Sequence, residues 1–225
     1  MKNKKRIFVA IDTSKISRAK KIIRDTQTNK IDVGYKFGLE FFYSKDGRKF
    51  LSSLKNQTIF LDLKLNDIPN TVVSALKSLK NLKISYLTVH LSSGFSALKI
   101  LKKESKNTKI VGVTTLTSLN NKDLKEIGYN KKVNDLVKHQ AKLAERANLD
   151  AIVCSGHEIR SVKKVFKKEI ITPGIKIQNF QNDQKRFMKP KDAFVAGSDW
   201  LVIGRSITSG DIKKNFKNLL KILED

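Results

Sequence analysis

The stretch TIFLDLKLNDIPNT, residues 58–71, decides how this chain folds and where its chemistry lies. Residues 58–61 are apolar, aromatic or β-branched, which predicts a buried strand. Side chains two residues apart on a strand point the same way, so Asp62 and Lys64 should lie side by side at its end. The opposite face of the strand should then carry Leu61, Leu63 and Leu65.

The turn that follows this strand adds a second acid and the start of a helix. Asp67 lies in the turn, and Pro69 suits the first turn of a helix that continues through Val73 and Leu76. Burying charged groups is costly unless they pair, so the two acids and the lysine should form a charge array. A purely structural ion pair is the alternative, but such a pair rarely needs three members so close together. We therefore favour a functional site here.

Apolar runs typical of strands alternate with longer helix-like stretches along the whole chain. Eight strands alternating with helices are the pattern of a (β/α)8 barrel, and a length of 225 suits one such domain, residues 1–225. An open doubly wound sheet is the alternative, but it usually carries a glycine-rich loop after its first strand, and residues 11–14 contain no glycine. The expected strands are Ile7–Ile11, Ile31–Phe37, Thr58–Leu63, Tyr86–His90, Lys109–Val113, Ala151–Cys154, Glu169–Thr172 and Trp200–Ile203.

Active sites of such barrels lie at the carboxyl ends of the strands, where polar residues do collect in this sequence. Any one of them could be a helix cap, but together they predict a site on one rim of the barrel. Taken alone, His90 is expected to be a hydrogen-bonded structural residue and Trp200 to lie in the core. Residues 120–132 and 178–186 are expected to be polar loops. The residues that collect at the strand ends are Asp12, Lys36, Asp62, Lys64, His90, the hydroxyl-rich segment Thr114–Ser118, Thr172, and the pair Gly204 and Arg205.

A formal net charge of +25 is typical of proteins that bind nucleic acid or anionic membranes. Of the 46 basic residues, however, 38 are Lys spread from end to end, and no aromatic-rich basic motif accompanies them. This pattern favours a drift in composition over a nucleic-acid partner. The charge can still help to attract an anionic substrate by long-range steering.

Membrane, disulfide and metal features are not expected. No run of 18 apolar residues exists, so the sequence predicts no membrane span. The single cysteine, Cys154, excludes an internal disulfide, suits a reducing cytoplasm and lies in a strand-like run, where it should be a small buried hydrophobe. The three histidines share no metal-ligand spacing, so no metal is expected.

These residues resemble the orotidine 5′-phosphate decarboxylase family in its shorter bacterial form. The resemblance implies a homodimeric (β/α)8 barrel that makes uridine 5′-monophosphate from orotidine 5′-monophosphate without a metal or an organic cofactor. The continuation Ile68-Pro69-Asn70-Thr71 makes the central signature specific. The matching segments are residues 9–12, 33–38, 62–71, 116–118, 153–155, 172–175 and 202–205.

The resemblance also implies the chemistry of the central signature. Loss of carbon dioxide leaves negative charge on carbon 6 of the pyrimidine, where a cofactor would normally act as the electron sink. Lys64 is implied to supply a fixed positive charge beside that carbon and then a proton. Asp62 and Asp67 would hold the ammonium in place, with Asp67 coming from the partner subunit. Asp62 would also lie near the departing carboxylate.

Further residues are carried over from the family as substrate contacts. Lys36 is implied to extend the charge network and to contact the ribose. Asp12 would accept a hydrogen bond from a ribose hydroxyl, and Thr71 would join Asp67 across the interface. Either Thr117 or Ser118 would contact the base, and the resemblance does not decide between these two hydroxyls. The other implied substrate contacts are Asn70, Lys176, Gln184, Gly204 and Arg205.

The sequence departs from the family pattern near the implied phosphate site. Lys176 stands where the family usually has Arg, and a lysine binds phosphate as a point charge without a two-pronged contact. The segment from Lys176 to Gln184 is also about one residue short. These departures put in doubt the detailed structure of the loop that folds over the phosphate in the family, but not the chemistry.

Two other functions remain as alternatives. Sugar-phosphate decarboxylases or aldolases of the same barrel superfamily share the acid–lysine–acid spacing, but they use magnesium held by acids at the strand ends, and this chain has Lys36 at one such position. A basic nucleic-acid-binding protein is the non-enzymatic alternative, and its affinity should fall steeply with salt.

Overall fold

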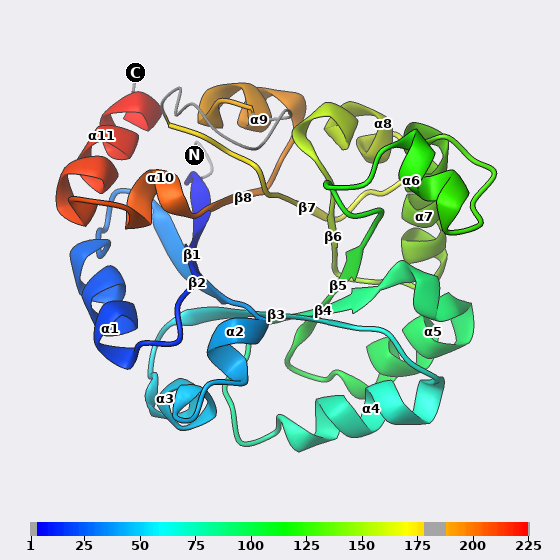
Figure 1. The fold of residues 1–225 in the computed structure, drawn as a ribbon, viewed down its shortest axis with the longest axis horizontal. Coiled ribbons are helices and arrows are strands. Elements are labelled where there is room, and N and C mark those ends of the chain that lie inside the picture. The colour runs from blue at the N-terminus through cyan, green and yellow to red at the C-terminus, as the bar shows by residue number, and fades with distance from the viewer. Residues whose placement is uncertain (1–3, 178–187, 225) are drawn as a thin grey trace.

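The computed structural model describes residues 4–177 and 188–224. Eight parallel strands pair in chain order, and β8 pairs with β1, so the sheet closes into a barrel (Figure 1). This confirms the predicted (β/α)8 barrel and excludes the open doubly wound sheet. The strands are β1 Arg6–Ile11, β2 Asp32–Phe37, β3 Thr58–Leu65, β4 Tyr86–His90, β5 Lys109–Val113, β6 Ala151–Val153, β7 Glu169–Thr172 and β8 Trp200–Ile203.

Helices form a ring outside the barrel (Figure 1). Their apolar residues recur every three or four positions, as in α7, whose buried residues include Val133, Val137 and Ala141. The α-helices are α1 Ile16–Asp25, α2 Leu39–Phe42, α3 Gly47–Ser53, α4 Pro69–Ser78, α5 Gly94–Glu104, α6 Asn121–Glu126, α7 Val133–Arg146, α8 Ile159–Lys163, α9 Pro190–Ala196, α10 Arg205–Thr208 and α11 Ile212–Glu224. Two short 3-10 helices are η1 Leu91–Ser93 and η2 Gly156–Glu158.

The expectation of a polar loop over residues 120–132 is wrong in part, because α6 lies within it. Asn120 caps this helix: its side-chain oxygen accepts from the backbone N–H groups of Lys122 and Asp123, at 2.7 and 3.3 Å. The Asp123 carboxylate accepts in return from the Asn120 N–H at 2.8 Å. Leu124 is the only residue of this six-residue helix that is buried, so no apolar periodicity announced it.

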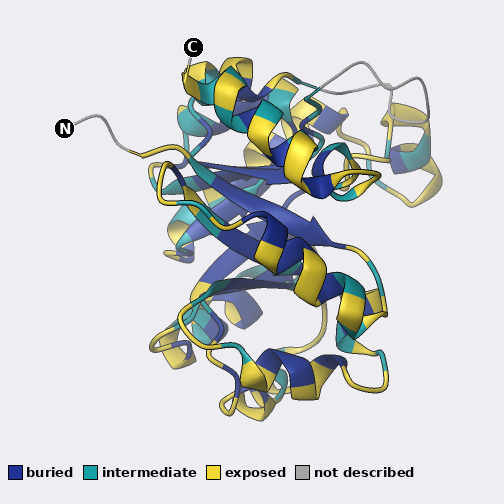
Figure 2. Cartoon of the chain, turned by 90° about the vertical axis from the view of Figure 1, so that its left-hand side faces the viewer, coloured by how far each residue is buried: buried dark blue, intermediate teal, exposed yellow. Residues whose placement is uncertain are grey.

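The core has two layers, one inside the barrel and one between the barrel and its helices. Figure 2 shows the strands as the buried centre and the helices as mixed buried and exposed. Inside the barrel, the Phe8 ring stacks on Trp200 at 4.1 Å between centroids, which confirms Trp200 as a core residue. Gly34 leaves room for this packing, since a Cβ there would lie 2.6 Å from Cε1 of Phe8. These two aromatic side chains belong to the buried cluster inside the barrel.

A partly buried ionic cluster lies at the amino ends of the strands. The Glu169 carboxylate accepts from Arg6 Nη1 at 2.9 Å, from Lys109 Nζ at 3.0 Å and from the Tyr86 hydroxyl at 2.9 Å. Burial by itself would raise the pKa of Glu169, but the hydrogen bonds from Lys109, Tyr86 and Arg6, together with the Lys109 charge, outweigh it and lower this pKa. The charges at this end therefore satisfy one another.

Within the described residues, no helix combines the length and apolar character needed to cross a membrane.

Candidate active site

Four charged side chains form an alternating row at the carboxyl ends of the first three strands. Lys64 Nζ lies 2.9 Å from Asp62 Oδ2, and Lys36 Nζ lies 3.6 Å from the same oxygen. Lys36 Nζ also lies 3.3 Å from Asp12 Oδ1. The structure thus brings together Asp12, Lys36, Asp62 and Lys64, as the rim argument from the sequence expected.

The central carboxylate, Asp62, is the more buried of the two acids in this row. The Asp62 side chain is 13% exposed, whereas that of Asp12 is 60% exposed. An exposed ion pair contributes about 0–1 kcal/mol, but removing one partner of a buried pair costs about 3–5 kcal/mol. Asp62 therefore determines whether Lys36 and Lys64 can share the site, and the pair with Asp12 matters less for stability.

Strand β3 is not regular where it carries these groups, which corrects the simple strand expected from the sequence. The register with β4 shifts between Leu61 and Leu65, so three residues of β3 face the single residue Thr88. Lys64 lies at the end of this bulge with a φ of 50°. A left-handed backbone at a residue other than glycine costs on the order of 1–2 kcal/mol. The site therefore stores backbone strain at its lysine.

Thr88 compensates for the interrupted strand pairing. Its hydroxyl oxygen accepts from the Lys64 N–H at 2.7 Å, and its hydroxyl donates to Asp62 Oδ1 at 3.1 Å. Thr88 is fully buried. Thr88 is absent from the site residues predicted above, although a threonine two residues before His90 places a polar side chain on the inner face of β4, which is a usable signal.

His90 lies next on the inner face of β4, above Thr88. Partial burial lowers the pKa of His90, the Lys64 charge lowers it further, and Asp62 offsets part of this effect. The imidazole is therefore neutral near pH 7. No hydrogen bond joins its side chain to another residue within 4–177 or 188–224, so the expectation of a hydrogen-bonded structural histidine is not supported.

A cavity of about 240 Å³ opens beside the row of charges. Thr117 lines this cavity, whereas Ser118 is exposed and does not line it. Two other hydroxyls of the same loop are engaged within the protein: Thr114 donates to the Val153 carbonyl at 2.8 Å, and Thr115 lies 3.2 Å from Oε1 of Gln140. Of the two residues predicted to contact the base, Thr117 is thus the one that lines the cavity.

Cys154 also lines the cavity and is buried, as expected. Burial raises the pKa of its thiol, and the Glu158 carboxylate raises it further. The thiol is therefore protonated and apolar in character, which makes it part of the cavity wall rather than a nucleophile.

Gly204 and Arg205, two of the implied phosphate contacts, follow β8 at the same end of the barrel, next to β1. A Cβ on Gly204 would lie 3.5 Å from Cβ of Ala10 and 3.6 Å from Oδ2 of Asp12, so Gly204 adjoins the charged row. Arg205 is exposed at the start of α10 and forms no ion pair with any described residue. The Lys176 N–H donates to the carbonyl of Met188 at 3.2 Å, whereas Gln184 lies outside the described residues.

The second acid of the signature does not join the row within one chain. Asp67 is exposed, and its Oδ1 accepts only from the Ile68 N–H, at 2.7 Å, among the residues that the structure describes. Ile68 itself is 66% exposed, and Asn70 and Thr71 are also exposed. The expected charge array of Asp62, Lys64 and Asp67 is therefore incomplete in a single subunit.

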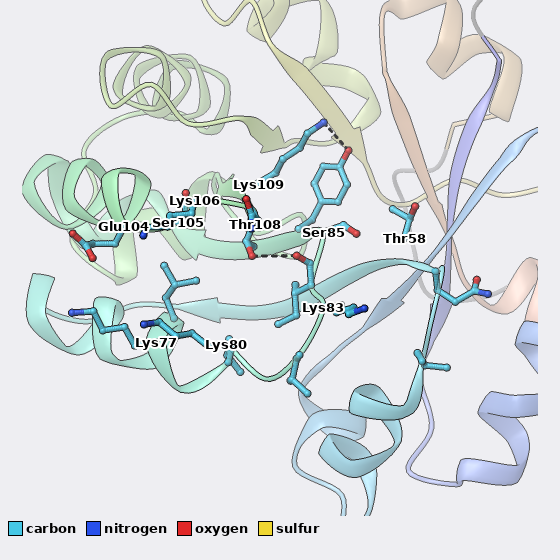
Figure 3. A pocket seen from close by; sticks show the side chains of 18 of the residues that line it. Thr58, Lys77, Lys80, Lys83, Ser85, Glu104, Ser105, Lys106, Thr108 and Lys109 are labelled. Atoms are coloured by element: carbon cyan, nitrogen blue, oxygen red, sulfur yellow. Dashed lines mark hydrogen bonds between the residues drawn. The ribbon is translucent and has the colours of Figure 1, made fainter.

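A larger cavity of about 1120 Å³ lies at the opposite end of the barrel, near the starts of β3, β4 and β5 (Figure 3). Lysine supplies 5 of its 20 lining residues, against 38 of 225 in the chain, so the excess is small. Lys109, whose Nζ lies 3.2 Å from the Tyr86 hydroxyl, already belongs to the Glu169 cluster. The charged rim is thus the better candidate site.

A closed parallel barrel with a row of lysines and carboxylates at the carboxyl ends of its strands defines a barrel enzyme with an anion-binding, charge-stabilising site. Comparison with known families identifies the family of barrel enzymes to which the chain belongs. The chain belongs to the orotidine 5′-phosphate decarboxylase / HUMPS family, whose model matches residues 5–215.

Individual relatives agree with this assignment over most of the chain. The sequence is 37% identical over 222 residues to an orotidine 5′-phosphate decarboxylase from Carboxydothermus hydrogenoformans, covering 93% of this chain and 91% of that protein. It is 42% identical over 198 residues to one from Buchnera aphidicola, covering 84% and 83%. A crystal structure of an orotidine 5′-phosphate decarboxylase from Lactobacillus acidophilus matches with a TM-score of 0.82 and 29% identity, covering 98% of this chain and all of that one.

Proposed function

We propose that this protein is a carboxy-lyase that converts orotidine 5′-monophosphate to uridine 5′-monophosphate and carbon dioxide, the last step of pyrimidine nucleotide synthesis. The observation that carries the proposal is the Lys64 ammonium, 2.9 Å from Asp62 beside a cavity at the active end of the barrel. Relatives that cover most of the chain bear the same activity in their names.

Lys64 would perform the central step. The bond between carbon 6 and the carboxylate breaks, carbon dioxide leaves, and the electron pair stays on carbon 6. The ammonium of Lys64 stabilises that developing charge and then gives a proton to carbon 6, which leaves a neutral amine that solvent reprotonates. The Lys64 side chain is 35% exposed, so solvent can reach it between turnovers.

Asp62 and Lys36 would set the position of the reacting ammonium. Asp62 binds Lys64 on one side and lies within 3.6 Å of Lys36 on the other, so displacing the carboxylate would leave Lys64 unpaired and Lys36 with Asp12 alone. The substrate carboxylate would enter near Asp62, where like-charge repulsion raises its energy before it leaves. Lys36 and Asp12 would contact the ribose hydroxyls.

A second subunit would complete the site. Asp67, Asn70 and Thr71 are exposed beside the apolar surface of Ile68, and Asp67 has no ionic partner within the described chain. We propose that a homodimer brings Asp67 of one subunit to Lys64 of the other, with Thr71 alongside and Asn70 as a further substrate contact.

The rest of the nucleotide would extend from the cavity over the rim. The cavity volume of about 240 Å³ lies below the roughly 300–1,000 Å³ of typical ligand pockets, so it would enclose the base and not the whole nucleotide. Thr117 would contact the base. Ser118 is the second candidate for this contact, but it does not line the cavity. The proposed phosphate contacts are Lys176, Gln184, Gly204 and Arg205.

The alternative of a magnesium-dependent sugar-phosphate decarboxylase or aldolase is not favoured. The position at the end of β2 that would need an acid carries Lys36, and its ammonium lies within 3.6 Å of the Asp62 carboxylate. A cation in that place repels a divalent metal ion.

The whole chain would act as one catalytic domain in the cytoplasm, without an organic cofactor or metal. The direct test is a spectrophotometric assay of orotidine 5′-monophosphate with protein pretreated with a chelator. Loss of the substrate absorbance is expected. A folded dimer that consumes no substrate in this assay would refute the proposed function.

A further inference from the structure

We infer that Thr88 is a positioning residue that fixes Lys64 and Asp62 relative to each other, an inference that rests on the proposed function. Its one hydroxyl joins the backbone of the lysine to the side chain of the acid. Thr88 does not reach the cavity, so it would act through these two residues and not on the substrate itself.

The bulge in β3 explains why the lysine needs such a residue. In a regular parallel pair, a carbonyl of β4 would accept the Lys64 N–H. Here the register shift between Leu61 and Leu65 moves that N–H out of the ladder. The Thr88 oxygen takes the place of the missing carbonyl, at 2.7 Å.

The same hydroxyl then orients the carboxylate. Because its oxygen accepts from Lys64 N–H, its single hydrogen is free to donate to Asp62 Oδ1, at 3.1 Å. That leaves Asp62 Oδ2 for the ammonium of Lys64, at 2.9 Å. The left-handed φ of 50° at Lys64 and the direction of Asp62 are therefore held by one fully buried side chain.

A substitution that keeps the shape of Thr88 but removes its hydroxyl tests this role. Thr88→Val should lower kcat about 30- to 100-fold, since a misplacement of about 1 Å can cost on the order of 100-fold, and should change KM less than about threefold. Thr88→Ser keeps the donor and the acceptor and should retain kcat within about threefold of the wild type.

Thr26→Val provides a matched control. Thr26 is also fully buried, and its hydroxyl also makes two contacts, to the Ile22 carbonyl at 2.8 Å and to the Tyr35 hydroxyl at 3.1 Å, but away from the rim. This variant should lose stability in a urea titration without a loss of kcat. If Thr88→Val does not fold, Thr88→Ala takes its place, with an expected loss in kcat of about tenfold or more.

The outcomes separate this inference from the proposed function. A wild-type protein without decarboxylase activity would refute the proposed function. An active wild type with Thr88→Val or Thr88→Ala at unchanged kcat would overturn the positioning role. Equal losses of kcat in Thr88→Ser and Thr88→Val, or in Thr26→Val and Thr88→Val, would also overturn it, because the effect would then reflect packing alone.

Discussion

The division of the site between two subunits can be tested by mixing two inactive variants, Lys64→Ala and Asp67→Ala. Within one chain, the Lys64 ammonium binds Asp62, whereas the Asp67 carboxylate turns to the Ile68 N–H and is exposed. If the partner supplies Asp67, each homodimer of a single variant has two broken sites. A heterodimer of the two variants has one site with both defects and one intact site.

The expected recovery follows from this symmetry. Random reassociation of equal amounts gives about one half heterodimers, each with one intact site of two, so the mixture should reach about one quarter of wild-type activity. The background should be small, because Lys64→Ala loses both a charge that stabilises the transition state and a proton donor, at least about 10⁴-fold together. Asp67→Ala should lose about 10²- to 10³-fold.

The measurement is the rate of substrate absorbance loss after the two variants are exchanged or co-expressed with different tags and the heterodimer is purified. The control pair is Lys64→Ala with Asp62→Ala, whose residues lie 2.9 Å apart on one strand and cannot complement across subunits. No recovery in the first pair, or equal recovery in the control pair, would refute the shared site.

Lys64→Ala alone should abolish turnover while the fold, followed by circular dichroism, is retained; turnover within tenfold of the wild type would contradict its role. Treatment with a chelator should leave the wild-type rate unchanged, and restoration of a lost rate by added magnesium would favour the sugar-phosphate alternative. Arg205→Ala should raise KM about 10- to 100-fold with a smaller change in kcat, because a charged contact to phosphate is lost; an unchanged KM would remove Arg205 from the phosphate site. The Cys154 thiol should react with iodoacetamide at pH 9 on the order of 100-fold more slowly in the folded protein than in urea, because burial raises its pKa above that of the unfolded chain. As the pH rises past the pKa that Cys154 has in the unfolded chain, only the unfolded state loses the thiol proton. The contribution of this thiol to folding stability therefore falls.

The sequence by itself determined the architecture. Runs such as residues 86–90 and 109–113 are apolar and bounded by turns, and the structure gives them as β4 and β5 with the expected bounds. Such patterns can be recognised within one segment, because the run or alternation of apolar side chains in a strand predicts which of its faces is buried. The same reasoning found that Asp12, Lys36, Asp62 and Lys64 would meet, because parallel strands in a barrel present all their carboxyl ends on one rim.

Only the tertiary structure decided how those residues meet. The bulge in β3, the left-handed backbone of Lys64 and the hydroxyl of Thr88 depend on the register between β3 and β4, which no single segment encodes. The preference for Thr117 over Ser118 at the cavity depends likewise on how the loop after β5 folds onto Gln140. Spacing along the chain grouped Asp67 with Lys64, yet the turn directs its carboxylate outward. Partners on other elements, Thr88 on β4 and Gln140 on α7, set the first two arrangements, and the Ile68 N–H sets the direction of the Asp67 carboxylate. These contacts form only in the folded chain, so residue order alone does not reveal them.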